Sequence, residues 1–304
     1  LGGVVSALTC YAAPGDAVLL HSPTYIGFTM CIENNGYKIV HSPLVKDENG
    51  IWRMDYEDMD AKIKANHIHV AVFCSPHNPC GRVWERWEIE KAMEVYKAND
   101  CIVISDEIWS DIIFPEAPFN SIYLLGNERC RRVMSVFGWS KSFGIAGMRI
   151  GCVYTTDPAL FERMVEKSDV MSTAGGISSL SQIAGTACMR NYDWVDAFLV
   201  HLKGNRDYAV DRLKHMPLVK AYAPRATYLL YVDIRAFGMK SEDFTDYMKQ
   251  KVKLALVSGG EKFFGQGSEG YIRICFATSR GILEEGLNRL EKGIRMLMEE
   301  KGLH

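Results

Sequence analysis

Residues 138–151 read Gly138-Trp-Ser-Lys141-Ser-Phe-Gly144-Ile-Ala-Gly147-Met-Arg149-Ile-Gly151. One apolar run, residues 133–137, precedes this stretch, and a second, residues 150–154, closes it. The pattern predicts a strand, a glycine-rich turn that presents a lysine, and another strand. Desolvation between two such strands disfavours the ammonium form of Lys141, so the free amine becomes available as a Schiff-base nucleophile. A buried loop lysine with a chance arginine nearby would produce the same pattern.

The composition of the 304-residue chain is that of a globular protein. Apolar residues make up 48% and charged residues 24%, and 35 basic against 37 acidic residues leave a net charge of −2. This balance argues against nucleic acid or an anionic membrane as the main partner. No apolar run approaches the roughly 18 residues of a membrane span, so we expect neither a membrane span nor a signal peptide.

The nine cysteines are scattered and form no Cys-x-x-Cys pair. An odd number without framework spacing indicates a reduced, cytoplasmic protein. The eight histidines show no metal-ligand spacing either, so we expect no metal site.

Short apolar runs alternate with helical periodicity over the first half of the chain. We expect strands at residues 17–20, 39–40, 70–74, 102–104, 133–137 and 152–154, and helices at 26–34, 56–64 and 85–98. This alternation predicts an α/β fold with a mostly parallel sheet sandwiched by helices. Ligands bind at the carboxyl ends of the strands in such sheets, so the residues after each run are site candidates.

The second half of the chain has a different pattern. A long helix is expected over residues 193–216, because Pro217 stops it, and a smaller α+β unit follows. We therefore expect a large domain over residues 1–186, a connecting helix over 187–216, and a small C-terminal domain over 217–304.

Polar residues at or within the predicted strands are the first candidates for a site. Asn78 lies in Ser75-Pro-His-Asn78-Pro-Cys-Gly81-Arg-Val-Trp84, which could also be an ordinary Asx turn. Asp106 ends a buried strand, where a carboxylate is costly unless it is paired; an N-cap role is the alternative. Arg273 lies in an apolar strand and needs an anion, which is either a ligand carboxylate or a structural salt-bridge partner.

Two further candidates lie near the start of the chain. Gly2 and Gly3 open a predicted helix whose free N–H groups and dipole suit a phosphate, although a helix without a cap would look the same. Tyr25 follows the first strand in His21-Ser-Pro-Thr-Tyr25-Ile-Gly-Phe28. Its spacing to Phe28 is also that of two core residues on one helix face.

These stretches together resemble the class I and II aminotransferases, which are pyridoxal 5'-phosphate (PLP) enzymes of fold type I. Residues 138–151 are similar to the PLP attachment site of that family, and residues 78–81 to its Asn-Pro-x-Gly signature. The longer string 75–84 resembles the cystathionine β-lyase/cystalysin branch of C–S lyases. Three residues depart from the family pattern: Gly138 replaces a frequent serine, Trp139 a smaller apolar residue, and Trp109 a tyrosine or histidine.

The resemblance implies a role for each candidate residue. Lys141 is the catalytic residue that bonds to PLP as a Schiff base, and Arg273 binds the α-carboxylate of an amino acid substrate. The implied PLP-binding residues are Gly3 and Val4 at the phosphate, Tyr25 on the ring, Asn78 at the phenolic oxygen, Asp106 at the pyridine nitrogen, Trp109, Ser140, and Arg149 at the phosphate.

The resemblance also implies a homodimer with its active site at the subunit interface, where residues 172–179 of the neighbour cover the phosphate. Relatives carry several dozen residues before the Gly2-Gly3 turn, so we expect a fragment or a shortened variant.

Three functions remain open. Arg149, which cystalysin-like relatives often lack, favours an aminotransferase acting on an L-amino acid, whereas residues 75–84 favour a C–S β-lyase acting on cystathionine or cysteine conjugates. The third is a non-enzymatic ligand-sensing domain. The intact Lys141, Asp106 and Arg273 argue against it.

Overall fold

The computed structural model describes residues 1–172 and 176–303. Its main sheet has six strands in the order β2-β1-β5-β6-β7-β8, of which only β8 runs antiparallel to its neighbour. The strands are β1 (Ala17–Ser22), β2 (Lys38–Pro43), β5 (Val70–Cys74), β6 (Ile102–Asp106), β7 (Val133–Phe137) and β8 (Cys152–Tyr154). The two central strands β5 and β6 are buried along their whole length, as expected for a sheet covered on both faces. The predicted α/β fold with a mostly parallel sheet is confirmed.

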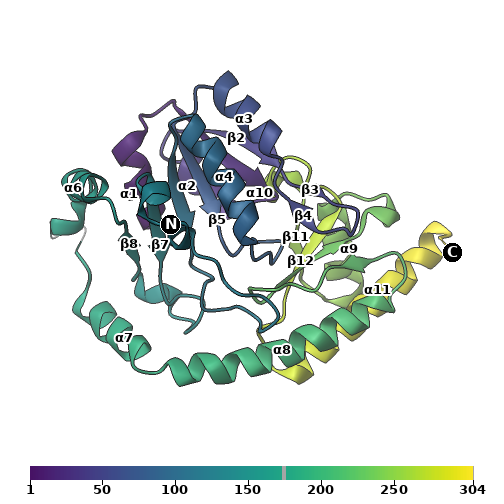
Figure 1. Ribbon diagram of the computed structural model, residues 1–304. Coiled ribbons are helices and arrows are strands. Elements are labelled where there is room, and N and C mark those ends of the chain that lie inside the picture. Colours follow the sequence, from purple (N-terminus) through teal and green to yellow (C-terminus); the bar gives the residue numbers. More distant parts are fainter. Residues whose placement is uncertain (173–175, 304) are drawn as a thin grey trace.

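Each face of this sheet has its own apolar core, because successive strand residues point to opposite sides. Leu19, Phe73 and Val103 pack on one side with α3 (Tyr56–Ala65) and α4 (Arg86–Ala98). Leu20, Val72 and Ile104 pack on the other with helices α1 (Gly2–Tyr11), α2 (Ile26–Glu33) and α6 (Pro158–Lys167). Figure 1 shows the sheet between these two helical layers.

A second, antiparallel sheet lies towards the C-terminus of the chain. Its strand order is β11-β12-β10-β9, formed by β9 (Lys220–Ala221), β10 (Leu229–Asp233), β11 (Val257–Ser258) and β12 (Tyr271–Cys275). The helices α8 (Tyr192–Lys214), α9 (Ser241–Val252) and α11 (Arg280–Lys301) share one apolar core with it. The expected domain limits at residues 186 and 217 stay a prediction, which the separation of the two sheets supports.

The helices α7 (Ser179–Met189) and α8 connect the two sheets. They run along one side of the molecule, from the edge strand β8 towards the second sheet (Figure 1). Short elements complete the described chain: the strand pair β3 (Val45–Lys46) and β4 (Trp52–Arg53), the helices α5 (Asn127–Cys130) and α10 (Glu261–Phe264), and the 3-10 turns η1 (Ile122–Leu125), η2 (Ala146–Met148), η3 (Asp169–Met171) and η4 (Arg235–Phe237).

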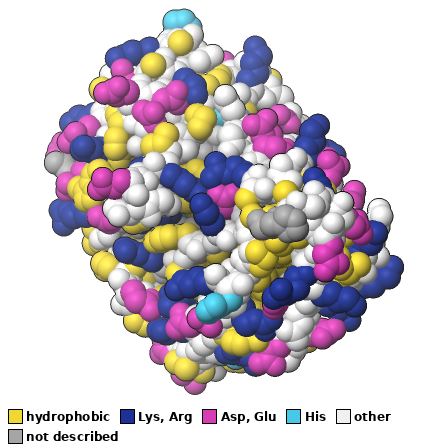
Figure 2. Space-filling model, turned by 90° about the vertical axis from the view of Figure 1, so that its right-hand side faces the viewer, with side chains coloured by type: hydrophobic (Ala, Val, Ile, Leu, Met, Phe, Trp, Pro, Cys, Tyr) yellow, Lys and Arg dark blue, Asp and Glu magenta, His cyan; other side chains and the backbone are white. Residues whose placement is uncertain are grey.

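Basic and acidic side chains are interspersed over the face shown in Figure 2, in keeping with the small net charge. In the described part of the chain, no helix has the length and apolar character needed to cross a bilayer. All nine cysteines are free thiols. Within the described ranges no three histidine, cysteine, aspartate or glutamate side chains gather where they could hold a metal.

Candidate active site

The predicted lysine turn joins β7 to β8. Its two ends approach closely at glycines: a Cβ on Gly138 would lie 3.1 Å from the carbonyl oxygen of Ile150, and one on Gly151 would lie 2.9 Å from that of Phe137. Within the turn, the N–H of Phe143 donates to the carbonyl of Trp139 over 3.0 Å. The glycines therefore allow the strand ends to meet while residues 139–143 loop out with the lysine.

Lys141 points its amine towards the aromatic ring of Trp109, and Nζ lies 5.2 Å from the ring centroid. Partial burial lowers the pKa of Lys141, and the nearby charge of Arg273 lowers it further, while Asp106 and Cys275 act in the opposite direction. Among the described residues the amine makes no hydrogen bond or ion pair. A half-buried amine of this kind is available to react.

Asp106 ends β6 and is buried. It accepts a hydrogen bond from the N–H of Ile108 over 2.9 Å, and no described residue forms an ion pair with it. Burial raises the pKa of Asp106, and the hydrogen bond from Ile108 and the charge of Lys141 only partly offset this. A buried carboxylate without a cation is costly, so this position suits a ligand that brings a positive group.

Arg273 connects the two sheets at the site. It lies on β12, and its Nη1 donates to Oδ1 of Asn78 over 3.3 Å, in the loop that follows β5. Its guanidinium also covers the ring of Phe264 at 5.3 Å. Burial lowers the pKa of Arg273, and Tyr25 opposes this effect. No described carboxylate pairs with Arg273, so the structure does not supply the salt bridge that was the alternative to a ligand.

Buried hydrogen bonds and a buried ion pair hold the Asn78 loop in place. Trp84 donates its indole N–H to the carbonyl of Cys74 over 2.9 Å, and Arg82 pairs with Glu88 of α4 over 2.6 Å, with both side chains fully buried. The backbone N–H of His77 donates to the carbonyl of Arg82. This framework fixes the direction in which Asn78 projects.

The start of α1 lies beside Tyr25. A Cβ on Gly27 would lie 2.3 Å from the Tyr25 ring and 3.0 Å from Leu1, so this glycine makes room for both. Gly3 packs against the sheet, since a Cβ there would lie 2.7 Å from Val153, and the side chain of Val4 is in the core. Only the backbone N–H groups of this first turn remain for a ligand, and such groups suit an anion.

The structure therefore brings together Lys141, Asp106, Trp109, Arg273, Asn78 and Tyr25. Ser140 and Arg149 make no hydrogen bond or ion pair with any described residue, and Arg149 is exposed with a left-handed backbone (φ 52°). In the segment 172–179, residues 173–175 lie outside the described residues.

Four residues that the sequence did not single out hold the lysine turn in place. Ser142 donates to Asp111 over 2.8 Å, Trp194 donates to the carbonyl of Ser142 over 3.2 Å, and Trp139 donates to the hydroxyl of Tyr192 over 3.1 Å. Trp139 and Tyr192 are 53 positions apart, so no local pattern could have revealed the contact. Only one feature of the sequence pointed to Asp111: it lies shortly after Asp106, in the segment that follows β6.

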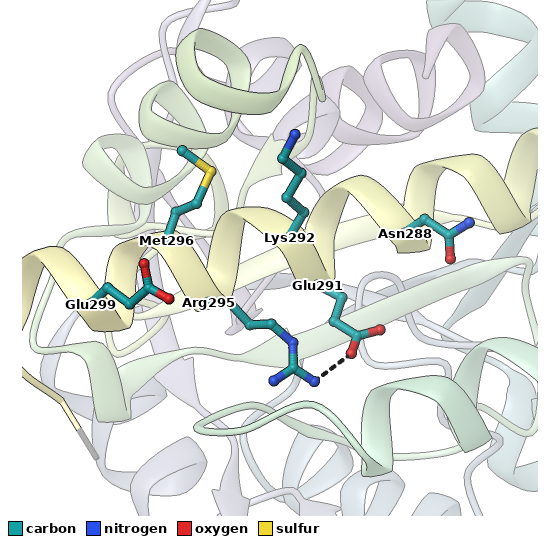
Figure 3. Close-up of a pocket in the computed structure, with 6 residues that line it drawn as sticks. All are labelled: Asn288, Glu291, Lys292, Arg295, Met296 and Glu299. Carbon is teal, nitrogen blue, oxygen red and sulfur yellow. Dashed lines mark hydrogen bonds and ion pairs between the residues drawn. The ribbon is translucent and has the colours of Figure 1, made fainter.

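Two surface hollows lie away from these residues. One follows the outer side of α11 (Figure 3), where Arg295 donates to Glu291 over 2.8 Å and the other lining side chains are mostly polar. The other lies behind the Asn78 loop, between Trp84, Trp87, Pro118 and Arg225. Lys141 lines neither hollow.

Comparison with known proteins shows the family to which the chain belongs. The family model for class I and II aminotransferases matches residues 2–290. The chain belongs to this family. Proteins with two different activities are similar in sequence to this chain. Cystathionine beta-lyase PatB of Bacillus subtilis is 30% identical over 96% of this chain and 76% of that protein. An aspartate aminotransferase of Pyrococcus abyssi is 27% identical, over 95% of this chain and 72% of that protein.

Solved structures of the family superpose closely on this aminotransferase-family chain. Cystalysin from Treponema denticola, which contains PLP, has a TM-score of 0.91 and 28% identity over 97% of this chain and 75% of its own. A PLP-bound putative aminotransferase from Clostridium difficile has a TM-score of 0.90 and 32% identity over 96% and 75%. The predicted fold type I is confirmed.

The protein is a PLP-dependent enzyme of this family, and its residues fit the cofactor. Asp106 is a buried carboxylate that forms no ion pair with any described residue, which suits a protonated pyridine nitrogen. Lys141 is an amine without a bond among the described residues, and the first turn of α1 offers N–H groups to a phosphate.

Proposed function

We propose that the protein is an aminotransferase that acts on an L-amino acid, with Lys141 as the residue that bonds to PLP. The observation that carries this proposal is the convergence of Lys141, Asp106 and Arg273 from three separate strands or turns onto one place. PLP, when bound, supplies an electron sink that stabilises negative charge at the α-carbon of the substrate. The remaining tasks are those of the chain itself.

Arg273 binds the α-carboxylate of the substrate. Its planar guanidinium presents two parallel N–H donors, and its burial strengthens the attraction for an anion. The hydrogen bond to Asn78 occupies one donor direction and sets the tilt of the guanidinium. The same asparagine has its amide N–H₂ left for the phenolic oxygen of the cofactor.

Lys141 accepts the α-proton. An amine can act as a base only when it is neutral, and the lowered pKa increases the neutral fraction near pH 7. Trp109 packs against this amine, and its own position is fixed by an edge-to-face contact with Tyr228 at 4.6 Å. Trp109 therefore limits the directions in which the amine can reach.

We assign the other PLP contacts as the resemblance implies them. Asp106 keeps the pyridine nitrogen protonated, Tyr25 lies on the ring, and the backbone of Gly3 and Val4, together with Ser140 and Arg149, holds the phosphate. The side chain of Arg149 is exposed, so an anion can reach it from solvent.

A C–S β-lyase is the second candidate, because PatB and cystalysin are as similar to this chain as the aminotransferases are. The two activities differ in their products. A transaminase converts an amino acid and 2-oxoglutarate into a keto acid and glutamate, whereas a β-lyase, with water, splits cystathionine into homocysteine, pyruvate and ammonia. We rank transamination first because of Arg149, since firm phosphate binding retains the cofactor when it is not bonded to Lys141.

The test is to incubate the PLP-loaded protein with L-cystathionine and, separately, with an aromatic or aliphatic amino acid plus 2-oxoglutarate. Glutamate formation in the second mixture supports the proposal. Rapid pyruvate and ammonia in the first, without glutamate in the second, would show that the protein is a β-lyase.

We further propose that the protein is a cytoplasmic homodimer. Large apolar side chains are exposed along α7 and the first half of α8, among them Leu180 at 71%, Ile183 at 67% and Val200 at 76%. A patch of this kind marks an interaction site, and a second copy is the partner that the family suggests. Light scattering should give the mass of a dimer, and Ile183→Glu should reduce it to that of a monomer.

A further inference from the structure

We propose that Asp111 is a positioning residue for Lys141, which acts through Ser142 and Tyr192. This inference rests on the proposed catalytic role of Lys141.

The contacts form a continuous chain on both sides of the lysine. Ser142, the next residue along, is buried and donates to Oδ2 of Asp111 over 2.8 Å. On the other side, Trp139 donates to the hydroxyl of Tyr192, which lies 3.4 Å from the same Oδ2 atom. Asp111 therefore receives hydrogen bonds that originate on both flanks of Lys141. Because the residues on both sides of Lys141 are held, rotation of the Lys141 side chain is the main motion left in the turn.

The network also connects the lysine to the two elements that matter for the site. Asp111 lies in the segment that carries Asp106 and Trp109, so the turn is tied to the residues that face the amine. Tyr192 and Trp194 begin α8, and further along this helix Leu202 and Leu213 belong to the core of the second sheet, from which Arg273 projects. Movement of that sheet would be transmitted along α8 to the lysine turn.

The serine side of this network is buried, whereas Tyr192 is 39% exposed. Ser142 is 3% exposed, and burial raises the pKa of Asp111, an effect that the hydrogen bonds from Ser142 and Tyr192 oppose. Buried hydrogen bonds fix geometry more firmly than exposed ones, and a displacement of about 1 Å at a reacting group can cost about a hundredfold in rate. The groups that set the charge environment of Lys141, namely Arg273, Asp106 and Cys275, are separate from this network.

The test compares Ser142→Ala, Asp111→Ala and Tyr192→Phe with the control Asp193→Asn, an exposed neighbour of Tyr192. In the PLP-loaded full chain we expect kcat to fall about tenfold in the first two variants, with KM within about threefold, because the base rather than the substrate is misplaced. The double variant of Asp111 and Ser142 should lose no more than the worse single variant, because both break the same hydrogen bond. The control should keep its rate.

A second measurement does not depend on the reaction. In the cofactor-free full chain, reductive methylation of Lys141 is followed against pH by peptide mass spectrometry, with the exposed Lys167 as internal reference. Loosening the turn exposes the amine, so its titration midpoint should rise towards the ordinary 10.5 in Ser142→Ala and Asp111→Ala. Ser142→Ala removes a single oxygen and carries the test if Asp111→Ala does not fold.

The proposal is overturned if the Lys141 midpoint in Ser142→Ala equals that of the wild type, or if the losses in the double variant multiply. If instead the protein fails to bind PLP but the midpoint shifts as expected, the positioning role stands and the proposed function fails.

Discussion

Replacing Glu88 should strongly lower the free energy of unfolding, because its carboxylate is buried and accepts three hydrogen bonds. Its Oε2 accepts from Arg82 over 2.6 Å and from the N–H of Glu85 over 2.8 Å, and its Oε1 accepts from Arg53 over 2.9 Å. Glu88→Ala removes both acceptor oxygens and so all three hydrogen bonds, and it leaves Arg82, which is fully buried, with the ring of Trp84 at 5.3 Å as its main remaining contact.

Removing one partner of a buried ion pair costs about 3–5 kcal/mol, because the other charge stays buried without compensation. We therefore expect Glu88→Ala to lower the free energy of unfolding by about 3–5 kcal/mol. Glu88→Gln keeps the shape and one acceptor oxygen, so its cost should fall between that of Glu88→Ala and zero. The matched control is Glu94→Ala, an exposed glutamate on the same helix, which should change stability by less than about 0.5 kcal/mol.

The assay is urea unfolding of the cofactor-free protein, followed by circular dichroism, with PLP affinity measured by titration. Because the Arg82–Glu88 pair supports the loop of Asn78, PLP affinity should fall in the same order as stability. A cost below about 1 kcal/mol for Glu88→Ala would refute the reasoning, because it would mean that Arg82 finds water or another partner without strain.

The remaining predictions concern the site. Borohydride reduction of the PLP-loaded protein should place the pyridoxyl group on Lys141 in a peptide map, and a label on any other lysine would contradict the assignment. Arg273→Lys keeps the charge but loses the two-pronged contact, so kcat/KM should fall by about a hundredfold or more while the PLP spectrum stays unchanged; an unchanged kcat/KM would rule out the carboxylate role. Asp106→Asn should stabilise the cofactor-free protein near pH 7, since the raised pKa of Asp106 means that its ionised form opposes folding. This gain should disappear as the pH falls below 3.8, where the carboxyl is protonated in both the folded and unfolded states, and a constant gain across pH would refute it. The same substitution should weaken PLP binding.

The sequence by itself determined the six strands of the main sheet and their order along the chain. The two-residue strands β3, β4, β9 and β11 were not predicted. Continuous apolar runs such as residues 70–74 and 133–137 became strands with the predicted limits, because a run of this length and composition is stable only when a sheet buries it on both faces. Asp106 and Asn78 were predictable for a related reason. The carboxyl ends of parallel strands meet at one edge of the sheet, so residues that follow different strands come together there.

Only the tertiary structure decided which residues support these groups. Arg273 meets Asn78 across 195 positions of the chain, and the partners of the lysine turn come from the start of α8. Such contacts depend on how α8 places the second sheet against the first, and local propensity carries no information on that placement. The same holds for Arg82 and Glu88, two charged residues that the sequence alone would assign to the surface. Their burial follows from the packing of α4 against the Asn78 loop, where each neutralises the other.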